Sequence, residues 1–392
     1  MRESLAQLPR TLWFLALGQF VNAAGSFVFV YLFVYLVGPR ELGLDEAGLI
    51  SGVAGAGAIA GNFTGGWFGD HYGHRTVLLA SAAVHGAALL VVPWTVTGWL
   101  LLVLPVANYT GGVMRAALAA LVAESVPAGV RRSAFALSRA AFNAGAIIGP
   151  PLGAVLATYS FTWLFVGDAL TTFLFAAVAL RVMPKVERHV RTAARVATPG
   201  LWASLRADRT LLVLLPAILA VDLVYRQLYT TFPVFLQDHG FALGLYGALI
   251  AVNAGLILCL ELPLAVVLRR LPPLALVGGG LVLVGLGFGV LGTAAALPVV
   301  VGAVLLVTVG EMLYKPTATA HVADAAPDGL QGRYQSLYAG ASVSGVVLAP
   351  LFGSAVYERA PSLLWPACLV VAVLAGVAVL LAGRRARLPA TL

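Results

Sequence analysis

The sequence predicts an all-α membrane protein in which twelve transmembrane helices form two pseudo-symmetric six-helix bundles. First, 60% of the 392 residues are hydrophobic and only 10% are charged, with a mean hydropathy of +0.95. Soluble proteins approach about 25% charged residues. Second, apolar runs of about 20 residues, long enough to cross a hydrocarbon core, recur between short polar connectors. Third, the two halves of the chain match each other after a shift of 200 residues.

The apolar runs define twelve spans. The first six are expected near residues 11–37, 45–68, 76–96, 98–122, 133–157 and 161–183, and the second six near 210–236, 244–268, 274–293, 297–321, 334–356 and 362–382. The first run is too long for a signal peptide and has no small-residue cleavage motif, so we expect a permanent span. Residues 1–183 then form an N-terminal bundle, 184–209 a basic cytoplasmic linker and 210–392 a C-terminal bundle.

Basic residues are distributed unevenly over the connectors. One side carries the linker together with Arg2, Arg10, Arg75, Arg131, Arg132, Arg269, Arg270, Arg333, Arg384, Arg385 and Arg387, whereas the other side carries only Arg40 and Arg359. This asymmetry predicts that both termini are cytoplasmic. The net charge of +8 therefore reflects topology, and we expect no nucleic-acid partner. The Ala-, Gly-, Val-, Leu- and Arg-heavy usage is typical of a GC-rich bacterial genome. Together with the apolar spans, it leads us to expect a multi-pass protein of a bacterial inner membrane.

The internal repeat supports a division into two halves of common ancestry. The shift of 200 residues aligns Glu124 with Asp324, Pro127 with Pro327, Gly145 with Gly345, Pro150 with Pro350, Gly153 with Gly353 and Arg115 with Lys315. Parallel halves of this kind suit alternating access, in which a binding site near the membrane midplane opens to each side in turn.

A short polar turn separates the second and third spans. Residues 66–78 read Gly-Trp-Phe-Gly-Asp-His-Tyr-Gly-His-Arg-Thr-Val-Leu. This stretch resembles the signature loop of the major facilitator superfamily, Gly-x-Leu-Ala-Asp-Arg-x-Gly-Arg-Lys-x-x-Leu. The matching residues are Gly66, Asp70, Gly73, Arg75 and Leu78, while His71 and His74 stand where the family usually has arginines.

The resemblance implies a gating role for this loop. Asp70, beside Arg75 and within reach of Arg131 or Arg132, is expected to lock the cytoplasmic ends of the two halves together when the site faces outward. Glycines Gly66 and Gly73 would allow the sharp reversal of the chain.

The fifth span carries a second resemblance. Gly145, Gly149, Pro150 and Gly153 fit the family's Gly-x-x-x-Gly-Pro-x-x-Gly-Gly element, which is associated with drug/proton antiporters; Ala154 replaces its last glycine. Glycines four residues apart allow close helix packing, and a proline kinks the helix. The element favours export, although a packing role alone would explain the same residues.

Charged residues inside membrane spans are costly and mark candidate sites. Asp222 and Arg226 are four residues apart in the seventh span, as are Glu311 and Lys315 in the tenth, and Arg115 lies in the fourth. At 1.5 Å per residue, both acids lie roughly 16–18 Å deep, near the midplane. We expect Asp222 and Glu311 to titrate protons, with Arg226, Lys315 and Arg115 as counter-charges. Static salt bridges are the alternative.

Polar and aromatic residues of the spans are the candidate substrate ligands. They are Asn22, Asn108, Tyr109, Asn143, Tyr225, Tyr229, Tyr314 and Tyr338. Such a set suits amphiphilic or aromatic small molecules, although tyrosines also anchor helices at membrane interfaces. For Asp168 we expect a structural hydrogen bond, and for His85 a packing role.

Other functional classes lack their motifs. No Gly-x-x-x-x-Gly-Lys-Ser/Thr loop indicates ATP binding, no His/Cys/Asp cluster has metal-ligand spacing, and no nucleophile–base motif indicates an enzyme. We therefore expect no cofactor, no metal and a monomer in the lipid bilayer. The expected function is proton-coupled efflux of small molecules by alternating access. Proton-coupled uptake of a nutrient, or a receptor or scaffold that retains the fold, are the alternatives.

Overall fold

A computed structural model describes residues 8–126, 131–183, 208–325 and 331–385. Most of the predicted linker, residues 184–207, lies outside the described residues. So do a few side chains within helices, among them those of Arg131, Arg132 and Arg269. Within the described part the chain forms helices and turns and no strand.

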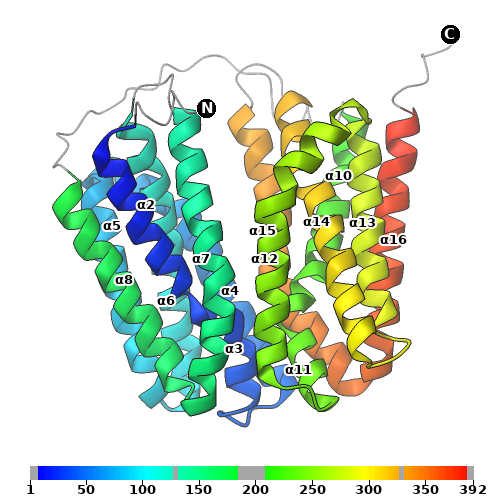
Figure 1. Ribbon diagram of the computed structural model, residues 1–392, viewed down its shortest axis with the longest axis horizontal. Helices are drawn as coiled ribbons and strands as arrows, with labels where there is room; N and C mark the ends of the chain where they lie inside the picture. The colour runs from blue at the N-terminus through cyan, green and yellow to red at the C-terminus, as the bar shows by residue number, and fades with distance from the viewer. Residues whose placement is uncertain (1–7, 127–130, 184–207, 326–330, 386–392) are drawn as a thin grey trace. The chain divides into compact units, whose positions relative to one another are not determined.

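Twelve segments of the described chain are long and apolar enough to cross a membrane. Their limits agree with the predicted spans to within four residues, except that the seventh and eighth end seven residues earlier, at Tyr229 and Glu261. The helices, shown in Figure 1, are α2 (Arg10–Ala24), α3 (Phe27–Val37), α4 (Leu44–Tyr72), α5 (His74–Val91), η1 (Val92–Trp94), α6 (Thr97–Glu124), α7 (Arg131–Tyr159), α8 (Thr162–Val182), α10 (Arg209–Tyr225), η3 (Arg226–Tyr229), α11 (Thr231–Asp238), α12 (Leu243–Val267), η4 (Leu268–Arg270), α13 (Pro273–Val290), α14 (Leu297–Ala325), α15 (Gln331–Arg359) and α16 (Pro361–Arg385).

The chain divides into two compact units. Unit 1 comprises residues 1–191 and 240–258, and unit 2 comprises residues 192–239 and 259–392. Residues 240–258, in the predicted C-terminal bundle, therefore belong to unit 1. Within that unit the Tyr246 hydroxyl on α12 donates to the Val30 carbonyl (3.2 Å), and the Tyr246 ring lies edge-on to Tyr31.

The internal repeat is visible in the element boundaries. α6 and α14 begin at positions 97 and 297, and α7 and α15 end at positions 159 and 359. Packing partners correspond as well: α5 lies against α6 and α8 in unit 1, and α13 lies against α14 and α16 in unit 2. The predicted fold, twelve membrane helices in two halves that repeat each other, is confirmed, whereas the compact units differ from those halves because residues 240–258 group with unit 1.

The first span is interrupted, whereas the sequence predicted one continuous helix. α2 ends at Ala24 and α3 begins at Phe27. A helix start leaves backbone N–H groups without acceptors, and the buried Asp168 carboxylate on α8 accepts from the N–H of Val28 (3.3 Å). This contact confirms the structural hydrogen bond expected of Asp168.

The seventh span is interrupted at the corresponding place. α10 passes into the short η3 turn, and α11 starts after Thr230. The buried Gln227 side chain bridges the break: its Oε1 accepts from the hydroxyls of Thr230 (3.0 Å) and Thr231 (2.7 Å), and its Nε2 donates to the carbonyl of Ala349 on α15 (3.2 Å). A buried glutamine in an apolar run signals such a role.

Glycines let α4 and α6 pack at backbone distance in unit 1. A Cβ added at Gly57 or Gly61 would overlap the carbonyls of Pro105 and Tyr109 on α6, and one at Gly65 would lie 2.9 Å from the Cα of Val113. The 200-residue shift aligns these three glycines with Ile257, Glu261 and Ala265 on α12. The matching positions of α12 therefore lack this glycine stripe.

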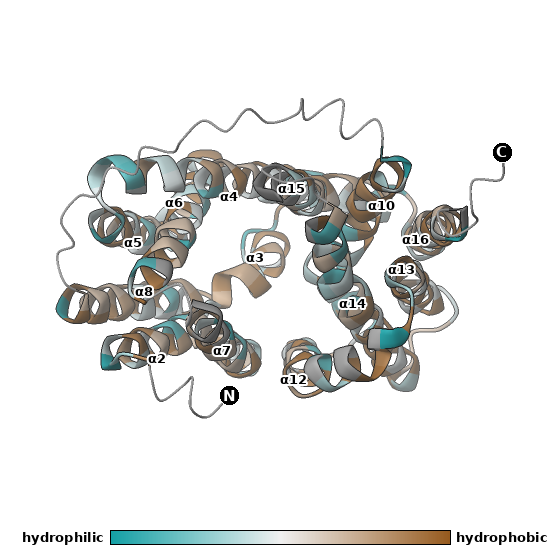
Figure 2. Cartoon of the chain, turned by 90° about the horizontal axis from the view of Figure 1, so that it is seen from above, coloured by the Kyte–Doolittle hydropathy of each residue, from teal (hydrophilic) through white to brown (hydrophobic). Residues whose placement is uncertain are grey.

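Each unit encloses an apolar core and presents apolar side chains outward. The unit 1 core joins α2, α5, α6 and α8 through residues such as Leu15, Leu78, Leu121 and Phe175. Hydrophobic residues cover most of the helical length in Figure 2. Many large ones are exposed on the helices, including Phe63, Trp99 and Leu374. Such a surface requires a hydrocarbon environment, so the protein is a multi-pass membrane protein.

Candidate functional site

A buried carboxylate joins α10 to α14 in unit 2. Asp222 is 2% exposed, and its Oδ1 accepts a 2.7 Å hydrogen bond from the hydroxyl of Tyr314. Its Oδ2 has no hydrogen-bond partner among the described residues. A carboxylate oxygen left without a donor in the interior is costly, so this atom marks a place for a proton or a ligand.

The predicted pair of Glu311 and Lys315 is formed on α14. The Lys315 ammonium donates to Glu311 Oε1 at 2.7 Å, and the side chains are 30% and 11% exposed, respectively. The Lys315 Nζ also lies 3.6 Å from the centroid of the Tyr225 ring on α10. A cation over an aromatic face is attracted by the ring quadrupole, the more strongly when both are shielded from water.

These contacts form one group, the acid–tyrosine cluster, made of Asp222, Tyr225, Glu311, Tyr314 and Lys315. Tyr229 extends it, because its hydroxyl lies 3.5 Å from that of Tyr225. Tyr338 borders it from α15 and donates to the Lys315 carbonyl at 3.4 Å. The described part of unit 2 thus brings both predicted acids, one predicted base and four predicted tyrosines together.

The role predicted for Arg226, a counter-charge to the acids, stays a prediction. This residue begins the η3 turn, and its Nε is buried without a hydrogen-bond partner among the described residues. The partner that the structure gives Asp222 is Tyr314 instead. No sequence spacing could signal this contact, since the two residues are 92 positions apart.

The predicted polar residues of the first half make contacts within unit 1. Asn22 Nδ2 donates to the Thr172 hydroxyl (2.9 Å), and Asn108 Nδ2 donates to the Leu104 carbonyl (3.0 Å). The Tyr109 hydroxyl accepts from Thr64 (2.9 Å), and Asn143 is half-buried on α7. Their proposed contact with substrate stays a prediction.

Arg115 on α6 and His85 both lie close to Gly111 in the same unit. A Cβ added at Gly111 would be 3.9 Å from the Arg115 guanidinium and 3.2 Å from the His85 ring. The His85 Nδ1 is bonded to the Ala107 carbonyl (2.7 Å), which confirms its packing role. Arg115 belongs to unit 1 and the acids to unit 2, so its role as a counter-charge to them stays a prediction.

The turn between α4 and α5 contains a small network of polar side chains. His74 lies 3.7 Å from the exposed Asp70 carboxylate and 3.0 Å from the Glu124 carboxylate at the end of α6. Arg75, the neighbour predicted for Asp70, donates to the Leu180 carbonyl on α8 (2.6 Å). His74 therefore occupies the place beside Asp70. The side chains of Arg131 and Arg132 lie outside the described residues.

Of the two glycines expected to allow the chain reversal, only Gly73 lies at the turn, whereas Gly66 lies within α4. Gly73 has a φ of +84°, a conformation that side chains oppose, and it ends α4 with its N–H donating to the Gly69 carbonyl. Around Gly66, by contrast, an added Cβ would meet no atom within 4 Å.

The glycines of α7 pack on the interrupted first span. An added Cβ would lie 2.5 Å from the Phe20 carbonyl at Gly145, 3.1 Å from the Ala24 carbonyl at Gly149 and 2.7 Å from the Tyr31 ring at Gly153. The Tyr31 hydroxyl donates to the Pro150 carbonyl at 2.6 Å. The predicted small-residue element is thus a close helix contact, and its connection with export stays a prediction.

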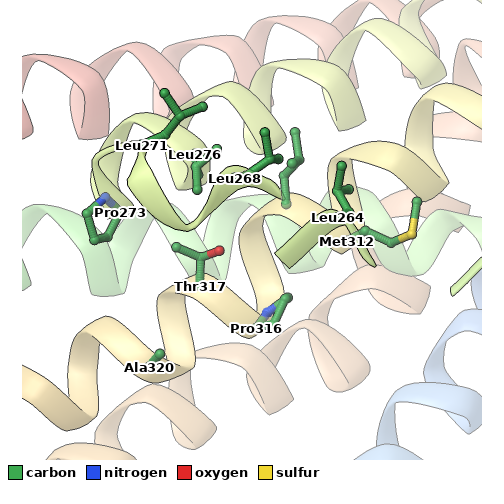
Figure 3. Close-up of a pocket in the computed structure, with 10 residues that line it drawn as sticks. Leu264, Leu268, Leu271, Pro273, Leu276, Met312, Pro316, Thr317 and Ala320 are labelled. Atoms are coloured by element: carbon green, nitrogen blue, oxygen red, sulfur yellow. The ribbon is translucent and has the colours of Figure 1, made fainter. Parts of the chain in front are cut away.

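An apolar cavity of about 230 Å³ lies between α12, η4, α13 and α14 (Figure 3). It is lined by Leu264, Leu268, Leu271, Pro273, Leu276, Met312, Leu313, Pro316, Thr317 and Ala320. At 100° per residue, its residues on α14 face away from Glu311, Tyr314 and Lys315. The cavity is therefore separate from the acid–tyrosine cluster. Its volume of about 230 Å³ is also below the range of about 300–1,000 Å³ that is usual for small-molecule sites. Among the described residues no group of three or more His, Cys, Asp or Glu could hold a metal ion.

A family model, the Major Facilitator Superfamily, matches residues 15–350. An uncharacterized MFS-type transporter of Bacillus subtilis, YttB, is 28% identical over 358 residues, which cover 90% of this chain and 89% of the relative. The multidrug efflux pump Tap of Mycobacterium bovis is 27% identical over 320 residues, with coverage of 75% and 74%.

Solved structures share the fold at low sequence identity. The nucleoside transporter NupG superposes with a TM-score of 0.80 at 12% identity, covering 95% of this chain and 99% of its own. A mutant of the peptide transporter POT in complex with sulfate superposes with a TM-score of 0.79 at 16% identity, covering 96% of this chain and 95% of its own.

Proposed function

Because this chain belongs to the major facilitator superfamily and is a membrane transporter rather than an enzyme, we propose that it exports amphiphilic or aromatic small molecules in exchange for protons. The two halves alternate in exposing a shared site to each side of the membrane. The acid–tyrosine cluster is the observation that carries the proposal.

Proton coupling rests on Asp222 and Glu311. Ionisable groups within a membrane span are costly and persist where they serve transport. Lys315 neutralises Glu311, and departure of the ammonium would favour proton uptake by that carboxylate. Asp222 has one bonded oxygen and one without a partner among the described residues, so its second oxygen can accept a proton. Arg226 and Arg115 complete the proposed set of counter-charges.

The proposed substrate class follows from the aromatic surroundings of these acids. Tyr225, Tyr229, Tyr314 and Tyr338 offer ring faces and hydroxyl groups, a combination that accommodates aromatic molecules with few polar groups. Asn22, Asn108, Tyr109 and Asn143 are the proposed contributions of the first half.

Export is favoured by two observations. Tap, similar to this chain over three quarters of its length, is a multidrug efflux pump. The Gly145–Gly153 element, typical of drug/proton antiporters, packs on the first span around Pro150. Asp70 and Arg75, with Arg131 and Arg132, are the proposed gate at the basic end of the halves. We place the protein as a monomer in a bacterial inner membrane, with both termini cytoplasmic.

Transport by the purified protein in liposomes tests this function. Liposomes of known orientation are loaded with ethidium, a cationic aromatic dye, or with chloramphenicol, a neutral aromatic amphiphile, and an inward proton gradient is imposed on the face that corresponds to the cell exterior. Export predicts gradient-dependent loss of at least one probe through that face, with matching alkalinisation outside. Flux of substrate and protons in the same direction would indicate nutrient uptake, and binding without flux would indicate a receptor.

A further inference from the structure

We propose that unit 2 contains a preformed binding site for an organic ammonium ion and that Lys315 fills this site as a tethered competitor. The inference deepens the proposed function, because it narrows the substrate class to cationic aromatic molecules; it rests on that function for the transport step and not for binding.

The surroundings of the Lys315 ammonium have the composition of an ammonium receptor. The ring of Tyr225 lies 3.6 Å from Nζ on one side, and Glu311 Oε1 lies 2.7 Å from it on another. The ring of Tyr314 follows at 5.8 Å. An aromatic face combined with a carboxylate is the pattern by which proteins recognise alkylated ammonium groups. The three groups come from α10 and α14, so the pattern exists without any ligand.

Lys315 is suited to leave this site. Its side chain is 30% exposed while that of Glu311 is 11% exposed, so the lysine is the more accessible partner of the ion pair. A lysine stem has several rotatable bonds, and its strongly hydrated ammonium can move towards water. A ligand cation that enters would replace Lys315 at Tyr225 and Glu311 without leaving the acid uncompensated.

A second, independent feature lies next to this site. The Asp222 Oδ2 is buried and has no partner among the described residues, and Tyr314 connects Asp222 to the same cluster. The acid–tyrosine cluster thus contains two carboxylates, Asp222 and Glu311, and Lys315 forms its ion pair with Glu311. A cationic ligand would therefore meet a second acceptor near the first, which a neutral ligand cannot use.

Binding to the full-length protein in lipid nanodiscs tests the inference. The probe is benzyltrimethylammonium, and its neutral carbon isostere neopentylbenzene has the same shape without charge. Benzenesulfonate is the anionic control. We expect wild-type protein to bind the cation in preference to the other two. Lys315→Met keeps the stem but removes the competing charge, and it should tighten binding of the cation at least tenfold, with no such gain for neopentylbenzene.

Two further variants separate the site from general changes in the protein. Lys315→Arg retains the competing cation and should show no tenfold gain. Tyr225→Leu should weaken binding of the cation at least tenfold, whereas Tyr225→Phe, which keeps the ring, should not. The tyrosine variants test the site in wild-type background and so remain decisive if Lys315→Met does not fold.

Cation binding that is unchanged or weaker in folded Lys315→Met would overturn the inference. Equal binding of benzyltrimethylammonium and neopentylbenzene would do the same, as would benzenesulfonate binding that depends on Lys315, because Lys315 would then be a ligand for anions. Binding without proton-driven export would contradict the proposed function alone, and export of chloramphenicol without any cation binding would contradict only the present inference.

Discussion

At the residue scale, the bond between Asp222 and Tyr314 is the contact on which the candidate site depends most. Tyr314→Phe should leave a buried carboxylate without its donor, at a cost of about 1.5–3 kcal/mol, whereas replacing both partners by apolar groups is far less costly. In a cycle of Asp222→Leu and Tyr314→Phe, we expect a coupling free energy of about 1 kcal/mol or more from thermal unfolding. Additive effects would show that the bond contributes nothing.

Asp168 provides a second test at this scale. Asp168→Ala removes the acceptor for the N–H of Val28 at the start of α3 and should lower the unfolding free energy by about 1–3 kcal/mol. Asp168→Asn retains a carbonyl oxygen at the same place and serves as the matched control. Unfolding temperatures in detergent compare the two, and equal losses would mean that charge, and not the hydrogen bond, is what the position requires.

The contacts of a residue could be predicted from the sequence only when its partner lies close to it in the chain. Glu311 and Lys315 are four apart, so helical periodicity predicts their pair. The contacts of Lys315 with Tyr225, and of Asp222 with Tyr314, join helices about 90 residues apart. Sequence reasoning identified these residues as candidates from the cost of burying charge, but only the fold assigns them their partners.

At the scale of elements, the contact between α4 and α6 depends on glycine. Gly61→Ala would place a methyl group on the Tyr109 carbonyl, and we expect a loss of about 1–3 kcal/mol from overpacking. Gly66→Ala, on the same helix, meets no atom within 4 Å and should leave stability unchanged or raise it slightly. Unfolding temperatures that fall equally in both variants would contradict this account of the packing.

The turn between α4 and α5 requires glycine for a different reason. A Cβ added at Gly73 would meet no atom within 4 Å, so there is space for a side chain. The φ of +84°, however, is a backbone conformation that residues with a Cβ rarely adopt. Gly73→Ala should therefore cost about 1–3 kcal/mol. Gly73→Asn is the matched comparison, because asparagine tolerates positive φ better than alanine, and it should retain more stability in the same unfolding assay.

The lengths of the elements were predictable, and their interruptions were not. Apolar runs fix where a span begins and ends, since polar connectors bound them. The breaks at Gly25 and Thr230 fall inside the predicted spans 11–37 and 210–236, so the limits of the spans do not locate them. They depend on partners in other helices: Asp168 on α8 supports the first break, and Gln227 with its acceptor on α15 supports the second.

At the scale of the whole molecule, the repeat of 200 residues organises the chain, and the two units have diverged in chemistry. Asp222 and Glu311 correspond by that shift to Asn22 and Gly111. Both predicted proton-titrating acids therefore belong to unit 2, while the glycine stripe of α4 belongs to unit 1. We infer that unit 2 carries the proposed coupling chemistry and unit 1 the signature loop, whereas close helix packing through glycines occurs in both, as between Gly280 and Gly310 in unit 2.

The central claim, that Asp222 and Glu311 couple substrate export to protons, is tested by comparing two modes of transport in the same liposomes. Substrate exchange without a gradient needs the site to alternate but needs no net proton movement. Asp222→Asn and Glu311→Gln should therefore retain exchange of the neutral probe chloramphenicol, whose binding needs no carboxylate charge, while losing its proton-driven export at least tenfold. If both variants kept full proton-driven export, or if exchange and export fell together, the account of these acids would be contradicted.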